Sequence, residues 1–172
     1  MDLQEALWNY REKIVDKWVD YTLSTYLSST FFKNEQDKFA NPTGGTVRDS
    51  LSSIFSLLRK AEADADYASA VEPFMLLRSV QDFSPSQAVA PINAVKHITR
   101  EVLKKDKETK DFVNDLYDFD FAVDLSMLAA FDTYVACRER LYQLRVNEIK
   151  TGKHVLTDSK CPSALLKDIS KS

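Results

Sequence analysis

The sequence is poor in the residues that interrupt regular structure. Its 172 residues include three glycines and five prolines. A β-sandwich or a doubly wound α/β fold needs many turns, and turns draw heavily on these two residues. We also find no run of alternating polar and apolar residues that would indicate a strand. The sequence therefore predicts an all-α fold.

Cysteine, net charge and long apolar runs are also scarce. The two cysteines, Cys137 and Cys161, form neither a disulfide framework nor a zinc-binding pattern, which fits a reducing compartment. A formal net charge of −3 argues against a general nucleic-acid binder, whose surface would be basic. No signal peptide is visible, and no apolar run approaches the length that crosses a bilayer. We expect a cytoplasmic protein that binds neither nucleic acid nor a membrane.

The residues of common catalytic and metal sites are few. His97 lies between Lys96 and Arg100, and we expect no carboxylate or second histidine beside it at helical spacing. His154 falls near the C-terminus. There is no phosphate-binding loop and no local pattern of nucleophilic catalysis. The sequence therefore predicts no enzyme, no cofactor and no metal site.

Apolar residues recur at steps of three and four, as is typical of amphipathic helices. One such helix is expected over residues 3–21, and residues 23–41 are less regular. A turn at residues 41–45, with the sequence NPTGG, is expected to precede the second clear helix. The apolar face of that helix consists of Val47, Leu51, Ile54, Phe55 and Leu58.

The segment RSVQDFSPSQAVA, residues 78–90, predicts a sharp corner between two helices. Ser84 is a good N-cap, Pro85 suits the first helical position, and Gln87 follows the cap by three residues, which together indicate a capping box. We expect one helix over about residues 73–82 and the next over about 86–103. Pro91 lies inside the second helix and should bend it.

Three further residues of the corner, Arg78, Gln81 and Asp82, have no capping role. They can form a solvated face, or they can tie the corner to a neighbouring helix or a partner. On the second interpretation they form a signalling corner, because the two helices meet there.

A long apolar repeat follows, from Phe112 to about Lys150, with Gly152 as the expected stop. About forty helical residues would extend about 60 Å, more than the width of a small domain. Either the helix breaks near residues 117–120, or its C-terminal part projects or pairs with another chain. A homodimer is expected, with an interface formed by Tyr134, Cys137, Leu141 and Leu144. Residues 1–152 are expected to form the domain and 153–172 a mobile tail.

Four aspartates near the start of this repeat resemble a carboxylate cluster. Their spacing places them on different sides of a helix, so we expect a solvated face rather than a site: Asp115, Asp118, Asp120 and Asp124.

Three segments, in this order and spacing, resemble one known family: NPTGGTVRDSLSSIFSLL, LLRSVQDFSPSQAVAPINAVKHITREVL and FDTYVACRERLYQLRVNEIK. They are similar to the N-terminal domain of RsbR-type stressosome co-antagonists, the RsbRD group, over about residues 3–150. The piece RSVQDFSPSQAV is the most specific. The resemblance implies a globin-like, all-helical sensor domain of bacterial stress signalling that lacks haem and dimerises through its last two long helices. Larger members carry a phosphorylatable STAS module, for which these 172 residues leave no room, so we expect a free-standing sensor or adaptor.

In the implied fold, the helix before the corner occupies the proximal side, where haem globins need a histidine. Met75 lies there instead, and methionine at helical spacing is typical of a core. Two functions stay open, a sensor that binds a small apolar ligand or a protein partner, and a structural adaptor whose pocket is filled by its own side chains. The candidate pocket residues are Leu51, Phe55, Phe74, Leu77, Val80, Phe119 and Val123.

Overall fold

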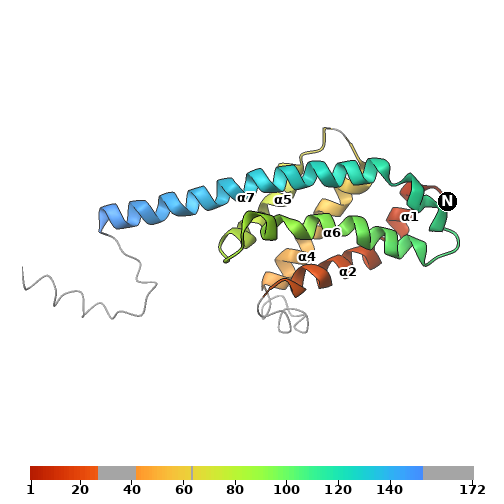
Figure 1. The fold of residues 1–172 in the computed structure, drawn as a ribbon, viewed down its shortest axis with the longest axis horizontal. Helices are drawn as coiled ribbons and strands as arrows, with labels where there is room; N and C mark the ends of the chain where they lie inside the picture. Colours follow the sequence, from red (N-terminus) through yellow and green to blue (C-terminus); the bar gives the residue numbers. More distant parts are fainter. Residues whose placement is uncertain (27–41, 63, 153–172) are drawn as a thin grey trace, which may run out of the picture. The chain divides into compact units, whose positions relative to one another are not determined.

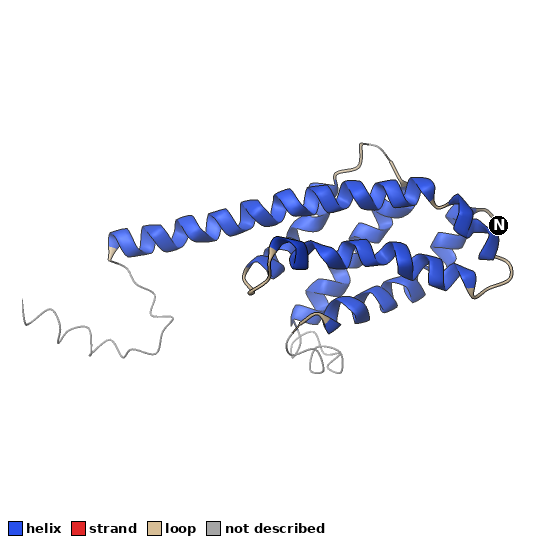
Figure 2. Ribbon diagram, in the orientation of Figure 1, coloured by secondary structure: helices blue, strands red, loops and turns tan. Residues whose placement is uncertain are grey.

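A computed structural model describes residues 1–26, 42–62 and 64–152, and within these ranges the fold is all-α without a strand, as predicted (Figures 1 and 2). The chain divides into two units, Met1–Arg138 and Glu139–Ser172. The first unit contains α1 (Leu3–Asn9), α2 (Arg11–Ser24), α4 (Pro42–Lys60), α5 (Tyr67–Ser79), α6 (Pro85–Lys104) and the 3-10 helix η1 (Lys110–Asp115). The boundary between the units falls inside α7 (Tyr117–Thr151). None of the described helices is both long and apolar enough to span a membrane.

The single helix expected over residues 3–21 is two helices, which meet at Tyr10. Asp2 begins α1 through a capping box, in which its carboxylate accepts a hydrogen bond from the Glu5 amide at 2.8 Å. The Tyr10 hydroxyl donates a hydrogen bond to the carboxylate of Asp106, just after α6. The sequence pattern missed this break because the apolar residues keep their helical spacing on both sides of it.

The turn expected at NPTGG is also wrong for the residues that the structure describes there. Pro42 is the first residue of α4, a position that suits proline, and the two glycines lie within its first turns. Gly44 is buried, which indicates that packing outweighs the low helix propensity of glycine. Asn41 lies outside the described residues. The predicted apolar face of α4 is buried, as expected.

The helix α5 begins and ends earlier than predicted, at Tyr67 and Ser79 instead of residues 73 and 82. Asp66 caps it by accepting a hydrogen bond from the Ser69 amide at 3.0 Å. Pro73 therefore lies inside the helix and does not start it. The preference of proline for a first helical position is the reason why the sequence predicted a later start.

The two long helices at the C-terminal side agree better with the sequence. The helix α6 spans the expected range, and the long apolar repeat is divided where η1 ends and α7 begins at Tyr117, which confirms the alternative of a break. Gly152 follows α7 with a φ of 65°, in the left-handed region that favours glycine, so the predicted stop is present. Within the second unit, most residues of its helix are exposed. Cys161, His154 and the predicted tail lie outside the described residues.

Candidate functional site at the corner between α5 and α6

Ser84 and Gln87 form both hydrogen bonds of the capping box at the start of α6. The Ser84 hydroxyl accepts from the Gln87 amide at 3.3 Å, and the Gln87 side chain accepts from the Ser84 amide at 3.0 Å. Pro85 is the first helical residue, and all three side chains are exposed. These residues fix the backbone at the start of α6 from the surface, so the interior of the corner consists of other side chains.

Arg78, in the last turn of α5, is completely buried, with 0% of its surface exposed. This burial excludes a solvated face for Arg78. Its Nη1 donates a hydrogen bond to Thr25 Oγ1 at 2.8 Å, and its Nη2 donates to the Gln87 carbonyl oxygen at 2.7 Å. One guanidinium thereby connects the C-terminal end of α2, the end of α5 and the beginning of α6.

Pro91 explains why the Gln87 carbonyl is available to Arg78. In an α-helix that carbonyl accepts from the amide four residues later, and Pro91 has no amide hydrogen. The guanidinium of Arg78 supplies the missing donor. The Pro91 carbonyl in turn accepts a hydrogen bond from the buried indole of Trp18 at 2.7 Å, so the region of α6 that proline alters is held by two side chains from other helices.

Aromatic rings surround the guanidinium of Arg78. Its central carbon lies 3.8 Å from the ring centroid of Phe83, 5.0 Å from that of Tyr26 and 5.7 Å from that of Phe74. The rings of Tyr26 and Phe83 meet edge to face, with centroids 5.8 Å apart. Burial raises the pKa of the Tyr26 hydroxyl, although the neighbouring Arg78 acts in the opposite direction. The ring faces attract the cation but carry no negative charge to neutralise it.

A carboxylate partner for Arg78 is missing among the described residues. No ion pair there includes Arg78, and its Nε is buried without a hydrogen-bond partner. Arginine stays protonated in proteins, and fully buried charges are usually paired. The corner therefore contains a permanent buried charge that the described side chains leave uncompensated.

The other two predicted corner residues lie in different environments. Gln81 is half-buried, and its Oε1 atom is buried without a hydrogen-bond partner. Asp82 is exposed. The predicted signalling corner therefore has an interior part, Arg78 and Gln81, and a surface part, Asp82.

Two side chains of α7 contact the backbone of this corner within the first unit. The Tyr134 hydroxyl donates to the Phe83 carbonyl oxygen at 2.6 Å, and Arg138 Nη1 donates to the Ser79 carbonyl oxygen at 3.1 Å. The corner is thus tied directly to α7. Nothing in the local sequence pattern indicated these contacts, because they join residues more than fifty positions apart.

The burial of α7 in the first unit corrects the predicted dimer interface. Tyr134 and Cys137 are buried inside the first unit of a single chain, so they do not provide a surface for another chain. In the second unit Leu141 is half-buried and Leu144 is exposed. A helical repeat identifies an apolar face but does not tell whether the same chain covers it, which is why the prediction was wrong for Tyr134 and Cys137.

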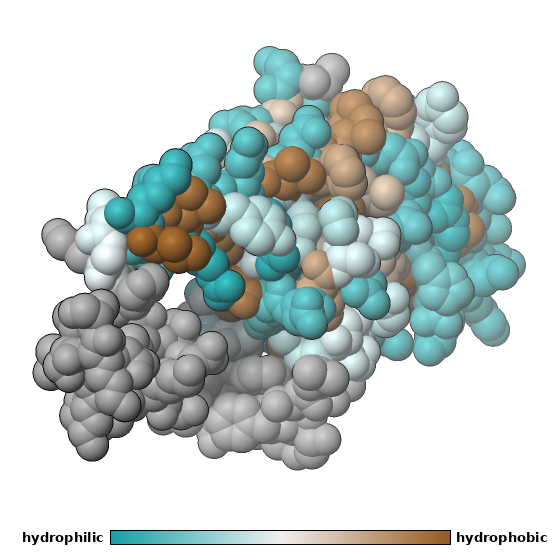
Figure 3. Space-filling model, turned by 60° about the vertical axis from the view of Figure 1, so that its left-hand side comes forward, coloured by the Kyte–Doolittle hydropathy of each residue, from teal (hydrophilic) through white to brown (hydrophobic). Residues whose placement is uncertain are grey.

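The outer face of α7 in the first unit was missed. Its exposed apolar side chains are Phe121, Leu128, Phe131 and Val135. Three of them are separated by seven residues, a spacing that was visible in the sequence. Figure 3 shows that hydrophobic side chains, in brown, gather in patches among hydrophilic ones on one side of the molecule.

Most of the predicted pocket residues form the packed core of the first unit. Leu51, Phe55, Phe74, Phe119 and Val123 are buried, and the rings of Phe55 and Phe119 meet with centroids 6.1 Å apart. Leu77 is half-buried. Val80 is 62% exposed, so its assignment to an enclosed pocket is wrong, because α5 ends before it and the side chain is open to solvent.

A hollow of about 290 Å³ lies elsewhere, between α4 and α5. Small polar side chains line it, among them Ser50, Ser53 and Ser69, and none of the predicted pocket residues does. This hollow is open to solvent, and its position differs from that of the apolar pocket that was predicted from the sequence.

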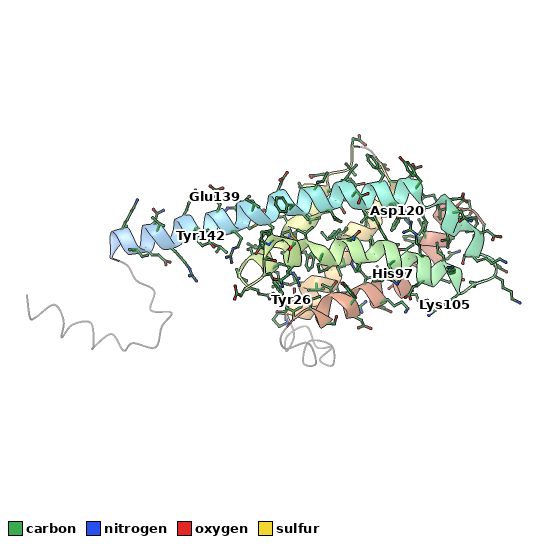
Figure 4. All side chains as sticks on the ribbon, in the orientation of Figure 1. Tyr26, His97, Lys105, Asp120, Glu139 and Tyr142 are labelled. Atoms are coloured by element: carbon green, nitrogen blue, oxygen red, sulfur yellow. The ribbon has the colours of Figure 1, made fainter. Side chains whose placement is uncertain are left out.

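Titratable residues form surface pairs rather than a site. His97 is exposed and lies 3.5 Å from Glu101 one helical turn later, so the expectation that no carboxylate lies at helical spacing was wrong. Asp120, labelled in Figure 4, pairs with Arg100, and Asp124 pairs with Lys96 at 2.6 Å, which links α7 to α6. In the described part of the chain no three His, Cys, Asp or Glu side chains are grouped to hold a metal.

Comparisons with known proteins identify one family. Residues 12–149 match the family model described as the RsbT co-antagonist protein rsbRD N-terminal domain. An uncharacterised protein of Archaeoglobus fulgidus is 25% identical over 139 residues, which cover 80% of this chain and 83% of the relative. No solved structure matches the chain.

Proposed function

Because the chain belongs to the family of RsbT co-antagonist rsbRD N-terminal domains, we propose that it is a non-enzymatic sensor domain of stress signalling. It acts in the cytoplasm as a globin-like domain without haem, and it responds to a small ligand or a protein partner. The absence of histidine from α5, where Met75 is buried, supports operation without haem. The signal leaves the domain through α7.

The connection of Arg78 to three helices is the observation that carries this proposal. A change in the core of the first unit alters the packing around Arg78, and this residue is bonded to Thr25 and Gln87. The corner then passes the change to α7 through Tyr134 and Arg138. A network with buried, directional contacts has few alternative arrangements, which suits a switch between discrete states.

The partner of the outer face of α7 is, in this proposal, a second copy of the chain. In the first unit α7 is apolar on its inner face, where Ala122, Val123 and Ala130 are buried, and also on its outer face. A helix that is apolar on both sides is normally covered on both. Phe121, Leu128 and Val135 follow a seven-residue repeat, which is the spacing by which two helices pair along a seam.

A structural adaptor is the second candidate function. The burial of Leu51, Phe55, Phe74, Phe119 and Val123 in the core favours it, because their own side chains occupy the region where an apolar ligand was expected. Native mass spectrometry of the purified protein separates the two functions, since it reports bound mass and subunit number together. A bound small molecule supports the sensor, and a ligand-free dimer supports the adaptor.

The dimer has a direct test in the exposed residue Leu128. Leu128→Glu places a charge on each copy's outer face and removes burial of about 1.5–3 kcal/mol per side chain, so we expect a dissociation constant raised roughly a hundredfold or more. Leu76→Glu is a matched control, because Leu76 is also an exposed leucine but lies on α5. Sedimentation velocity should give a monomer for Leu128→Glu and a dimer for the control. A monomeric wild type at micromolar concentration contradicts the proposed dimer.

A further inference from the structure

The buried charge of Arg78 indicates a binding site that is separate from the predicted apolar pocket and from the outer face of α7. We propose that Arg78 binds a small anion from solution, a carboxylate or a halide, at the Nε edge of its guanidinium. The site follows from the contacts of Arg78 alone, and only its use as a signal input rests on the proposed sensor function.

Among the described residues, no acceptor is hydrogen-bonded to the Nε edge of the Arg78 guanidinium. Nη1 and Nη2 are bonded to a hydroxyl and a backbone carbonyl, both of which are uncharged. Nε is buried and has no partner. A guanidinium cannot lose its proton at ordinary pH, so burial cannot be relieved by neutralisation as it can for lysine or histidine. A charged acceptor at Nε satisfies the hydrogen bond and the charge at once.

Gln81 provides a second polar group at the same corner. Its Oε1 atom is buried and unpaired, and the residue follows Arg78 by three positions. Rotation of an amide by half a turn exchanges its oxygen and its NH2 group, and the two orientations are chemically interchangeable in an unpaired site. In the rotated orientation, Gln81 is a donor for the same anion.

The environment limits the anion to a small one. The side chain of Arg78 has no exposed surface, and the ring of Phe83 covers one face of the guanidinium at 3.8 Å. An anion therefore enters only in the plane of the guanidinium, as the corner opens. Chloride, formate and acetate require the least opening of the corner, whereas a bulky polyhydroxylated carboxylate such as gluconate requires the most.

Binding of an anion at this site can affect the position of α7. The anion neutralises the charge of the Arg78 guanidinium, which lies against the rings of Phe83 and Tyr26. Phe83 connects this position to α7, because its carbonyl oxygen accepts the hydrogen bond of Tyr134. Binding therefore stabilises the closed corner and the position of α7 that goes with it.

The test measures the thermal midpoint of the full chain in sodium chloride, sodium acetate and sodium gluconate at constant ionic strength. Wild type should show a saturable rise in chloride or acetate relative to gluconate, of about 5 °C or more at a roughly hundredfold excess over the dissociation constant. A rise in chloride alone identifies a halide site, and a rise in acetate alone identifies a carboxylate site. Equal midpoints in all three salts overturn the proposal.

Variants assign the effect to Arg78. Arg78→Met should abolish the anion dependence, whereas Arg48→Met, at an exposed arginine paired with Asp16, should retain it. An unchanged response in Arg78→Met overturns the proposal. If Arg78→Met does not fold, Gln81→Leu is the variant to measure. We expect its apparent dissociation constant for the anion to rise at least threefold. An unchanged dissociation constant in Gln81→Leu counts against the site. Sedimentation velocity in the same salts shows separately whether the dimer forms, so failure of the proposed function and failure of the anion site are distinguishable.

Discussion

The contact between Arg78 and the Gln87 carbonyl exists because Pro91 cannot donate to that carbonyl, and this dependence can be measured. Arg78→Met removes hydrogen bonds to Thr25 and Gln87 and leaves the part-buried Gln87 carbonyl without a donor. Hydrogen bonds that involve a charged group contribute about 1.5–3 kcal/mol each, and removal of the buried charge offsets part of this loss. We expect Arg78→Met to lower the free energy of unfolding by about 2–4 kcal/mol.

The same substitution should cost less in a Pro91→Ala background. An alanine at this position has an amide hydrogen that bonds the Gln87 carbonyl within α6, so removal of Arg78 then leaves that carbonyl satisfied. The double-mutant cycle should therefore give a coupling of about 1–2 kcal/mol between Arg78 and Pro91. Trp18 keeps its hydrogen bond in every variant, because it binds the backbone carbonyl of residue 91.

Urea unfolding at one protein concentration and in one buffer gives the required free energies. Tryptophan fluorescence has contributions from the buried Trp18, which reports the packing between α2 and α6, and from the exposed Trp8, and circular dichroism follows the helices. The single protein concentration matters because dimer formation contributes to apparent stability. Strict additivity of the two substitutions would refute the account of Pro91 as the reason why the Gln87 carbonyl accepts a hydrogen bond from Arg78.

Two further predictions concern local contacts. Ser84→Ala should lower the free energy of unfolding by about 1 kcal/mol, measured by urea unfolding, because the Gln87 amide loses its acceptor; no change would show that the capping box is not needed at this corner. The hydrogen bond from Tyr10, followed by one from the Glu108 amide, lowers the pKa of Asp106, so the folded state favours the carboxylate. This stabilisation is present above the ordinary carboxyl pKa and is lost as pH falls through the lowered value. Thermal midpoints measured against pH should show this loss in wild type and a weaker one in Asp106→Asn, and equal slopes would contradict the role of Asp106.

Local features of this protein could be predicted well from its sequence. The all-α fold follows from the scarcity of glycine and proline, the capping box from Ser84, Pro85 and Gln87, and the stop of α7 from Gly152. Each of these depends on interactions within about one helical turn, so the residues that determine the structure are neighbours in the sequence. The family resemblance rests on such segments and agrees with the match over residues 12–149.

Boundaries were less predictable where a distant contact competes with a local preference. The break at Tyr10 is held by Asp106, almost a hundred residues later. Proline and glycine signals near residues 42 and 73 indicated a turn and a helix start, yet both positions are helical in the structure. Pro42 occupies the first position of α4, which proline favours, and Pro73 lies inside a helix that already begins after its cap at Asp66.

Only the tertiary structure decided which polar and apolar residues are inside. In the sequence Arg78 resembles an ordinary surface arginine, but the fold brings Thr25, Gln87 and three aromatic rings around it. Tyr134 and Phe131 belong to the same apolar repeat, but the chain covers the first and leaves the second exposed. Helical periodicity is a property of one helix, whereas burial depends on which other helices pack against it. The core face of α7, its outer face and the charge at the corner that the described side chains leave uncompensated therefore follow from contacts that no single segment contains.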